Sequence, residues 1–335
     1  SLGANDAANC FGSAVASRMV KFRLAAGLCA LFVVVGALAE GRAGIETLRG
    51  LTAVNLEQAV VITVAAALTV SLLTLLGLPA STSQAAVGAI LGIGFFNQEI
   101  NLGGLGKVVA CWFGTPLGAV LAALVLYRVL GAAYNRLPIS LFQGDMLLRA
   151  GLIAAGSYAS YTLGANNVAN ATAVFVGAGR LSVFAAALIG GLSIALGVLT
   201  YSRGVMETVG SKLVRLDPFS ALMVLLAEGL TMHFFTIIGV PVSTSQAVVG
   251  AVLVAVVRAR RGSQAPEEHL EITDLNDKYR ETGRALKRAT HSHHALRKAI
   301  RAERKEDKAR EKVKGEQRRR VFVIDFHGDI KASEV

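Results

Sequence analysis

Two short polar motifs, each present twice, are the parts of this chain whose residue types and spacing favour ion chemistry. Gly3-Ala-Asn-Asp-Ala-Ala-Asn9 recurs as Gly164-Ala-Asn-Asn-Val-Ala-Asn170, and Pro79-Ala-Ser-Thr-Ser-Gln84 recurs as Pro241-Val-Ser-Thr-Ser-Gln246. All four copies are flanked by apolar sequence. Polar residues at membrane depth usually have a function or a partner, so the pattern indicates a binding site.

The Gly-Ala-Asn motif has the ligands that a hard cation prefers. Its amides stand four residues apart, so Asn5 and Asn9 share one helix face, as do Asn166 and Asn170. Asp6 adds a carboxylate, and carboxylate and amide oxygens suit a cation such as sodium. Small residues around the amides allow another helix to approach closely.

The Pro-x-Ser-Thr-Ser-Gln motif has the features of a helix start and therefore suits an anion. Proline ends the preceding helix, Ser or Thr caps the next one, and its first N–H groups remain free. A helix N-terminus of this kind binds anions. No Lys or Arg lies in either motif, so the charge of a bound anion would be balanced by a co-transported cation. The alternative is that Asn, Ser and Thr only bridge helices, and the duplication of both motifs argues against it.

The elements that carry these motifs are apolar enough to span a membrane. The chain has 335 residues, 53% of them hydrophobic, and a net charge of +11. Residues 1–257 hold 13 basic and 9 acidic residues, whereas residues 258–335 hold 21 and 14. The first part is too apolar for an ordinary soluble enzyme. Stretches near the required length of about 20 residues are Leu24–Ala39, Ala59–Leu78, Val108–Leu130, Leu152–Val176, Ser182–Tyr201 and Phe219–Val240.

The two motifs recur in register, at offsets of 161 and 162 residues, which indicates a duplicated unit. The positive-inside rule places the Arg18–Arg23 loop inside the cell and its counterpart Arg180 outside, so the two copies are inverted. We therefore predict an all-α polytopic membrane protein, an inverted-topology repeat transporter with broken or half helices and a charged cytoplasmic helical tail.

The predicted domains are a first repeat at residues 1–138, a second, inverted repeat at 146–258 and the tail at 259–335. In the second copy, residues 146–163 form a predicted half-helix that leads into the Gly-Ala-Asn motif. The first copy has only two residues at that place, and the second copy lacks a counterpart of Val108–Leu130. The repeat symmetry therefore predicts that the first repeat is truncated at its start and that the second lacks its last helix.

Over residues 1–257 the paired motifs resemble the inorganic phosphate transporter (PiT) family. The resemblance implies cation-coupled symport of phosphate, with sodium or protons as the coupling ion and no other cofactor or metal. By position, the cation-binding residues would be Asn5, Asp6, Asn9, Asn166, Asn167 and Asn170. The phosphate-binding residues would be Ser81, Thr82, Ser83, Gln84, Ser243, Thr244, Ser245 and Gln246.

The chain departs from the family pattern at two places. Asn167 stands where many members carry Asp, and Val33 stands where many carry Glu. Glu228, in a membrane span near His233, is the candidate for a replacement coupling acid. Some relatives carry sulfate, so a permease for sulfate or another oxyanion is the alternative interpretation of the substrate.

The tail resembles the start of SohB-type membrane serine peptidases. Residues 268–276, the charged helix that follows them and residues 321–335 carry this likeness, and the catalytic Ser and Lys of that family would lie beyond Val335. The second alternative is therefore a membrane-anchored peptidase fragment that lacks its catalytic part. The terminal strand is expected to be poorly ordered.

The expected partners are inorganic phosphate, sodium ions and membrane lipid, without nucleic acid, in a multi-pass protein of the cell membrane. A homo-oligomer is left open. The three cysteines lie in apolar segments and are expected to be buried thiols.

Overall fold

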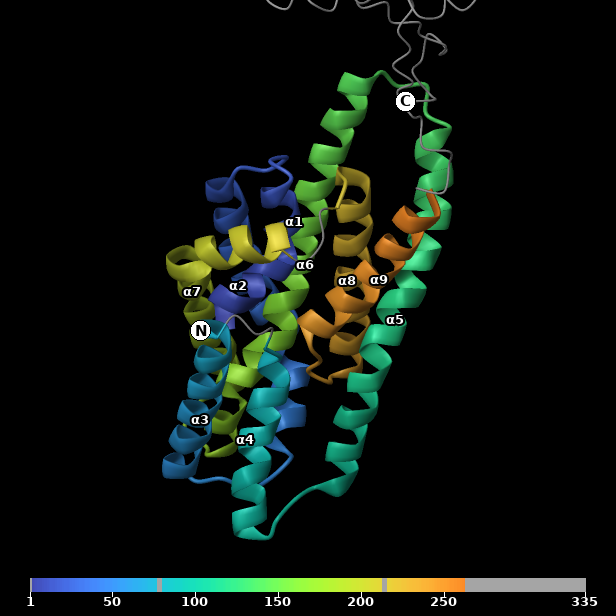
Figure 1. Ribbon diagram of the computed structural model, residues 1–335. Helices are drawn as coiled ribbons and strands as arrows, with labels where there is room; N and C mark the ends of the chain where they lie inside the picture. The colour runs from blue at the N-terminus through green and yellow to red at the C-terminus, as the bar shows by residue number, and fades with distance from the viewer. Residues whose placement is uncertain (1, 77–79, 213–215, 263–335) are drawn as a thin grey trace, which may run out of the picture. The chain divides into compact units, whose positions relative to one another are not determined.

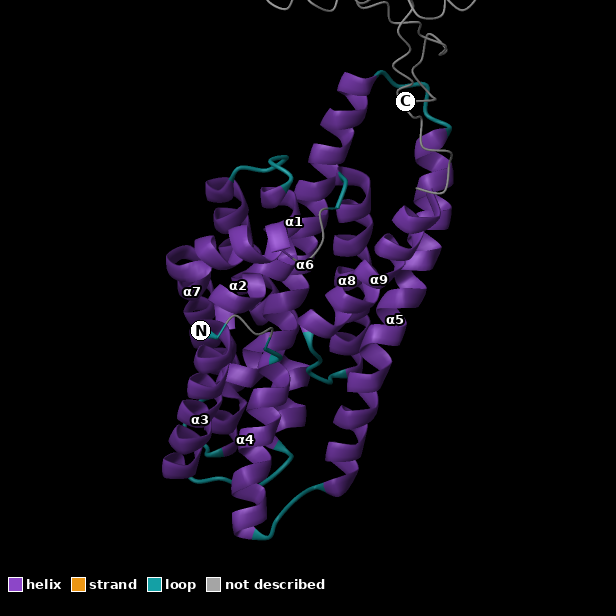
Figure 2. Cartoon of the chain, in the orientation of Figure 1, coloured by secondary structure: helices purple, strands orange, loops and turns teal. Residues whose placement is uncertain are grey.

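The computed structural model describes residues 2–76, 80–212 and 216–262, and the regular structure in these ranges is helical (Figures 1 and 2). The helices are α1 (Leu2–Ala16), α2 (Phe22–Arg49), α3 (Leu56–Leu75), α4 (Thr82–Asn97), α5 (Leu102–Asn135), α6 (Leu141–Gly177), α7 (Val183–Lys212), α8 (Pro218–Ile238) and α9 (Thr244–Gly262). The predicted tail helix and terminal strand lie outside the described residues.

The described helices form a membrane-embedded bundle. Helices α2, α3, α5, α7 and α8 are long and apolar enough to cross a membrane. Large apolar side chains on their outer faces are exposed, among them Leu68, Leu121, Leu196 and Ile237. Such a surface suits hydrocarbon rather than water. The prediction of a polytopic all-α membrane protein is confirmed.

Close helix contacts relate the two halves by a pseudo-two-fold axis. A Cβ on Gly164 of α6 would lie 1.9 Å from the carbonyl oxygen of Val33 in α2. A Cβ on Gly3 of α1 would lie 2.0 Å from the carbonyl oxygen of Ile194 in α7. Ile194 follows Val33 by the same 161 positions that separate the two glycines. Each Gly-Ala-Asn helix therefore packs on the long helix of the opposite half, as the small residues of the motif predict.

Two helical hairpins complete this symmetry. Helix α3 packs on α4, and helix α8 packs on α9. Figure 1 shows the α3–α4 hairpin entering from the lower end of the bundle and the α8–α9 hairpin from the upper end. Residues 80–84 and 241–246, at the tips of the two hairpins, meet in the middle. This arrangement is the inverted-topology repeat that the basic residues predict.

The second Gly-Ala-Asn motif lies inside a continuous helix, which corrects the predicted half-helix at residues 146–163. Helix α6 runs from Leu141 to Gly177 with the motif near its middle. The physical reason is that the segment has no proline and that its glycines adopt helical dihedral angles, so the hydrogen-bond ladder is not interrupted. The chain instead breaks at the second hairpin tip, where Gly239 has a positive φ of 79° and Pro241 follows.

Candidate functional site

The four motifs meet where the hairpin tips approach α1 and α6. The Asn5 side chain donates to the carbonyl oxygen of Ala80 at 3.3 Å. In the other half the Asn166 side chain donates to the carbonyl oxygen of Val242 at 2.8 Å and accepts from its N–H at 3.0 Å. The first asparagine of each Gly-Ala-Asn motif therefore holds the hairpin tip of its own half.

The last asparagine of each motif reaches the opposite half. Asn9 donates to the hydroxyls of Thr244 and Ser245, at 3.2 Å and 3.4 Å. Asn170 donates to the Ser83 hydroxyl at 2.9 Å. The tips also contact each other, because the Ser83 hydroxyl donates to the carbonyl oxygen of Val242 at 2.9 Å. One connected polar site therefore joins the two repeats.

Asp6 is the charged group of this site, and only 1% of its surface is exposed. Its Oδ1 accepts from the Asn5 side chain at 2.9 Å, and its Oδ2 accepts from Asn167 at 2.7 Å and from the Thr82 hydroxyl at 3.0 Å. All three donors are neutral. Within the described ranges no Lys or Arg forms an ion pair with Asp6. A buried carboxylate without a cationic partner is unfavourable, so the site as built calls for a cation.

Two further oxygens of the motifs are buried and lack a hydrogen-bond partner among the described residues. They are Oδ1 of Asn170 and Oε1 of Gln246. Amide oxygens of this kind are ligands that hard cations accept. The donor set therefore fits a bound cation beside Asp6.

The helix N-termini of both hairpins point into the site. Ser81 caps α4 by accepting from the Gln84 N–H, and Ser243 accepts from the Gln246 N–H, each at 3.3 Å. The first N–H groups of α4 and α9 have no intrahelical acceptor. The two glutamines differ, because the Gln84 side chain is exposed whereas that of Gln246 is half-buried. Two opposed helix N-termini with hydroxyls form an anion-binding environment.

Known proteins identify this arrangement. A sequence profile described as the phosphate transporter family matches residues 2–142 and again residues 142–267. The chain belongs to the phosphate transporter family. The double match agrees with the internal repeat, and the membrane part belongs to a family of transporters rather than of enzymes.

Individual relatives of this transporter differ in the anion that their names give. A protein of Methanocaldococcus jannaschii named as a phosphate permease is 30% identical over 75% of this chain and 79% of its own length. The sulfate permease CysP of Bacillus subtilis is 30% identical over 78% of this chain and 74% of its own. A solved structure, "The sodium-dependent phosphate transporter", superposes with a TM-score of 0.67 at 24% identity, covering 79% of this chain and 88% of the other. This last likeness shows the shared fold.

A second profile, that of the peptidase family S49 N-terminal region, matches residues 234–335. It is consistent with the resemblance of the tail to membrane peptidases. Most of the matched residues lie outside the described part of the chain.

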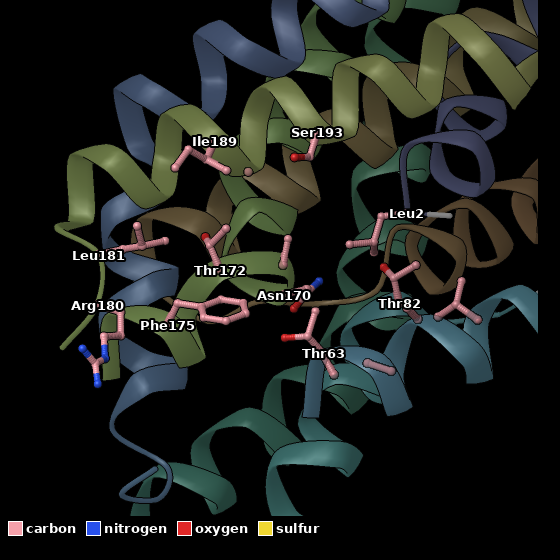
Figure 3. A pocket seen from close by; sticks show the side chains of 16 residues that line it. Leu2, Thr63, Thr82, Asn170, Thr172, Phe175, Arg180, Leu181, Ile189 and Ser193 are labelled. Carbon is pink, nitrogen blue, oxygen red and sulfur yellow. The ribbon is translucent and has the colours of Figure 1, made fainter. Parts of the chain in front are cut away.

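An apolar cavity of about 440 Å³ lies beside the motifs of this transporter (Figure 3). Thr82 and Asn170 line it next to the site, together with Thr63 of α3 and Thr172 of α6. Figure 3 shows Arg180 at the opposite end from Thr82. The cavity therefore leads from the α6–α7 turn, which carries an exposed cation, to the hydroxyls and amides of the site.

Glu228, the candidate coupling acid, lies in the protein interior on α8. Only 1% of its surface is exposed, and its Oε2 has no hydrogen-bond partner in the structure. It lies within electrostatic range of Asp6 and Cys29. Although His233 is close in sequence, it contacts other residues, described below. Cys10 and Cys29 are buried free thiols, and Cys111 is a half-buried one.

Sequence reasoning missed a polar cluster of Glu40, Tyr158 and His233. These residues come from three helices and are up to 193 positions apart, so no local spacing connects them. The available signal was the presence of an acid and a histidine within apolar spans.

Proposed function

We propose that the chain transports inorganic phosphate across the membrane in symport with a cation. The observation that carries this proposal is Asp6, a buried carboxylate held by three neutral donors between two opposed helix N-termini. A cation at Asp6 and an anion at the N-termini of α4 and α9 would neutralise each other. Each ion would then improve the binding of the other, which is the thermodynamic basis of symport.

The assigned roles follow the contacts. Asp6 would hold the cation with oxygens of the asparagines, and the unpartnered Oδ1 of Asn170 is available as a ligand. The phosphate would bind the free N–H groups of α4 and α9 and the hydroxyls of the two serine-rich tips. Thr82 and Thr244 would contact both ions, because Thr82 donates to Asp6 and Thr244 accepts from Asn9.

Sodium is the proposed cation at Asp6. The site offers one carboxylate and several amide oxygens without a second acid, which suits a monovalent hard cation better than a divalent one. The solved transporter that shares this fold is named as sodium-dependent, which agrees with the same choice.

Sulfate is the second candidate anion, and the similarity to the sulfate permease of Bacillus subtilis favours it. Uptake of radiolabelled phosphate into proteoliposomes, with excess sulfate as competitor, separates the two. Saturable phosphate uptake that sulfate inhibits weakly supports the proposal. Sulfate uptake that phosphate fails to inhibit would replace phosphate with sulfate as the substrate.

A further inference from the structure

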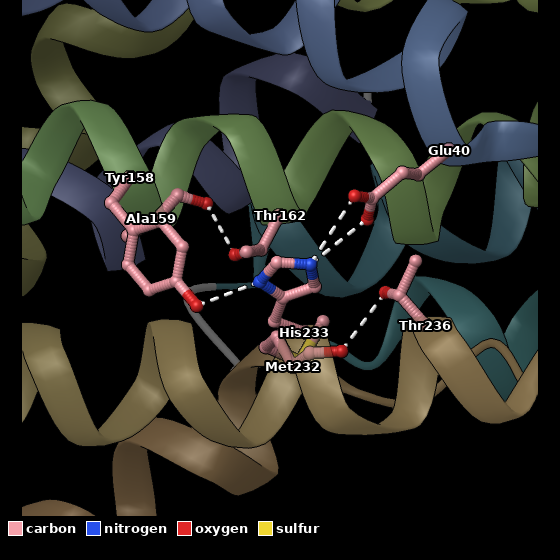
Figure 4. Close-up of polar contacts among 7 residues, drawn as sticks. All are labelled: Glu40, Tyr158, Ala159, Thr162, Met232, His233 and Thr236. Carbon is pink, nitrogen blue, oxygen red and sulfur yellow. Dashed lines mark hydrogen bonds and ion pairs between the residues drawn. The ribbon is translucent and has the colours of Figure 1, made fainter.

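A second cluster of titratable side chains lies apart from the four motifs, where α2, α6 and α8 pack together (Figure 4). His233 of α8 is at its centre. The Nε2 of His233 lies 3.1 Å and 3.3 Å from the two carboxylate oxygens of Glu40 in α2. The Nδ1 of His233 lies 2.8 Å from the hydroxyl of Tyr158 in α6. The proposed transport function uses none of these residues.

The donors and acceptors of this cluster define a place for one proton. The Glu40 carboxylate only accepts, so Nε2 carries a hydrogen and donates to it. When the imidazole is neutral, Nδ1 accepts from the Tyr158 hydroxyl. A second proton on the ring makes Nδ1 a donor to the Tyr158 oxygen, which reverses that hydrogen bond. The net charge of the cluster then changes from −1 to 0.

Within the described part of the chain, Glu40 has His233 as its ion-pair partner. The nearest guanidinium groups on α2 pair with another acid, because Arg42 lies 3.9 Å from Glu46 and Arg49 also contacts Glu46. The titratable and charged groups nearest the cluster are Glu40, Arg42 and Glu46 of α2, Tyr158 and Tyr161 of α6, Lys107 of α5 and His233 itself. Protonation of the His233 imidazole therefore neutralises the negative charge of Glu40.

The cluster borders an open cavity. Glu40 lines this cavity of about 480 Å³ together with Arg42, Glu46, Thr236 and Ile237. The side chains of His233 and Glu40 are 27% and 34% exposed. Neither side chain of the pair is therefore sealed in the packed interior.

The same three helices lead to the proposed ion site. Tyr158 precedes Asn166 of the second Gly-Ala-Asn motif by eight residues within α6, which is about 12 Å along the helix. His233 lies five residues before the end of α8 at Ile238, after which Pro241 begins the second anion motif. The end of α8 is also attached to α2, because the Thr47 hydroxyl donates to the carbonyl oxygen of Gly239. A change at His233 can therefore shift the hairpin tip that carries the second anion motif.

We propose that Glu40, Tyr158 and His233 form a proton-binding site, separate from the cation site at Asp6, whose occupancy is coupled to anion binding. This inference rests on the proposed function. The deprotonated cluster bears one negative charge, and its Tyr158 lies about 12 Å along α6 from Asn166, which holds the hairpin tip. The protonated cluster bears no net charge, so the repulsion of a bound anion is removed. The proton therefore favours the anion-bound state, and by reciprocity the anion favours the protonated cluster.

Phosphate affinity of the purified full chain in detergent micelles tests this coupling. It is measured from about pH 5.5 to about pH 8, where an imidazole titrates, for the wild type, His233→Gln and Glu40→Gln. Phosphate itself titrates in this range, but the ratio of wild-type to variant affinity at each pH cancels that effect. His269→Gln, which removes an imidazole from the charged tail, is the matched control.

The ratio of wild-type affinity to His233→Gln affinity should rise by at least about fivefold from the alkaline to the acidic end of the range. A change of about fivefold is the lower end of the affinity changes that coupled sites usually show. Glu40→Gln, whose deprotonated cluster is neutral, should bind phosphate more tightly than the wild type at the alkaline end, and His269→Gln should behave like the wild type. Calorimetry in buffers of different ionisation enthalpy should detect proton uptake on phosphate binding that His233→Gln lacks.

A ratio of wild-type to His233→Gln affinity that does not change with pH overturns the inference. Should His233→Gln fail to fold, Glu40→Gln carries the test, and an affinity equal to that of the wild type at the alkaline end overturns the inference. Should the protein bind sulfate but not phosphate, the proposed substrate is wrong, and the same comparison is made with sulfate, whose charge is constant in this range. A pH-independent ratio for that anion overturns the proton site independently of the substrate.

Discussion

At the scale of single residues, the two halves of the site are nearly identical, and they differ in charge at one pair of equivalent positions. Asp6 and Asn167 occupy equivalent positions of the two repeats and are joined by a 2.7 Å hydrogen bond. The pair therefore carries one negative charge instead of two. We expect this single charge to determine how many cations the site holds.

Asp6→Asn should abolish the dependence of phosphate uptake on sodium. The amide keeps the size of the side chain but removes the charge that balances the cation, and uptake driven by a sodium gradient should fall by at least about tenfold, the effect of losing about 1.4 kcal/mol of cation binding. Uptake into proteoliposomes measures this. Asp145→Asn, which alters an exposed acid in α6, is the matched control and should retain wild-type uptake. Sodium-driven uptake that persists in Asp6→Asn would remove Asp6 from the cation site.

Asn167→Asp should make the sodium dependence steeper. The substitution places a second carboxylate against Asp6, and two like charges in contact require an additional cation or a proton. The sodium dependence of phosphate uptake should then show a higher Hill coefficient than in the wild type. An unchanged coefficient with normal uptake would mean that residue 167 does not face the cation.

The Glu228→Gln variant tests whether Glu228 couples ion movement to transport or has only a structural role. The substitution keeps the shape of a buried side chain whose Oε2 lacks a partner. If Glu228 couples ion movement to transport, accumulation of phosphate against its gradient is lost while exchange of phosphate across the membrane continues. Loss of both activities in a folded protein, or of neither, contradicts that role.

The residue scale also shows where sequence reasoning succeeds and where it stops. Comparison of the two repeats identifies the asparagines and hydroxyl residues of the site, because their spacing is local and duplicated. It cannot show that Asn9 reaches Thr244, or that Glu40 meets His233, because these contacts depend on how three or more helices pack.

At the scale of elements, the glycines of the Gly-Ala-Asn motifs set the distance between helices. Gly164→Ala would force α6 away from Val33 of α2, since the new Cβ would overlap a backbone oxygen that cannot rotate aside. Overpacking of this kind costs about 1–3 kcal/mol. The melting temperature of the purified protein should therefore fall by several degrees.

Gly27→Ala is the control on the same helix pair. Gly27 is exposed on α2, and a Cβ there would meet nothing within 4 Å. Because Ala favours a helix over Gly by about 1 kcal/mol, this variant should be as stable as the wild type or slightly more stable. Equal stability of Gly164→Ala and Gly27→Ala would contradict the close packing of α2 on α6.

The sequence predicts the elements well where hydropathy alone decides them. The span predicted at Phe219–Val240 matches α8 closely, whereas α5 and α6 extend well beyond the predicted apolar stretches. Polar residues at the helix ends, such as the Ser140 cap of α6, carry no hydropathy signal. The predicted stretch Leu152–Val176 already crosses the second Gly-Ala-Asn motif, whereas the half-helix predicted at residues 146–163 treats the motif as a break.

At the scale of the whole molecule, the net charge of +11 is an average of two unlike parts. The few basic residues of the membrane part follow the pattern that sets topology. Within the described ranges none of them hydrogen-bonds to a residue of the four motifs. In the proposed function the neutral anion environment would make transport depend on a cation, and the inverted repeats would provide two equivalent gates for alternating access. The domain boundaries at residues 138, 146 and 258 stay predictions.

The measurement that tests this account most directly is phosphate accumulation in proteoliposomes under an inward sodium gradient, compared with equal sodium on both sides. We predict transient accumulation above the external concentration with the gradient and simple equilibration without it. Identical uptake under the two conditions, with the protein folded and phosphate transported, would contradict cation coupling at the convergent motifs.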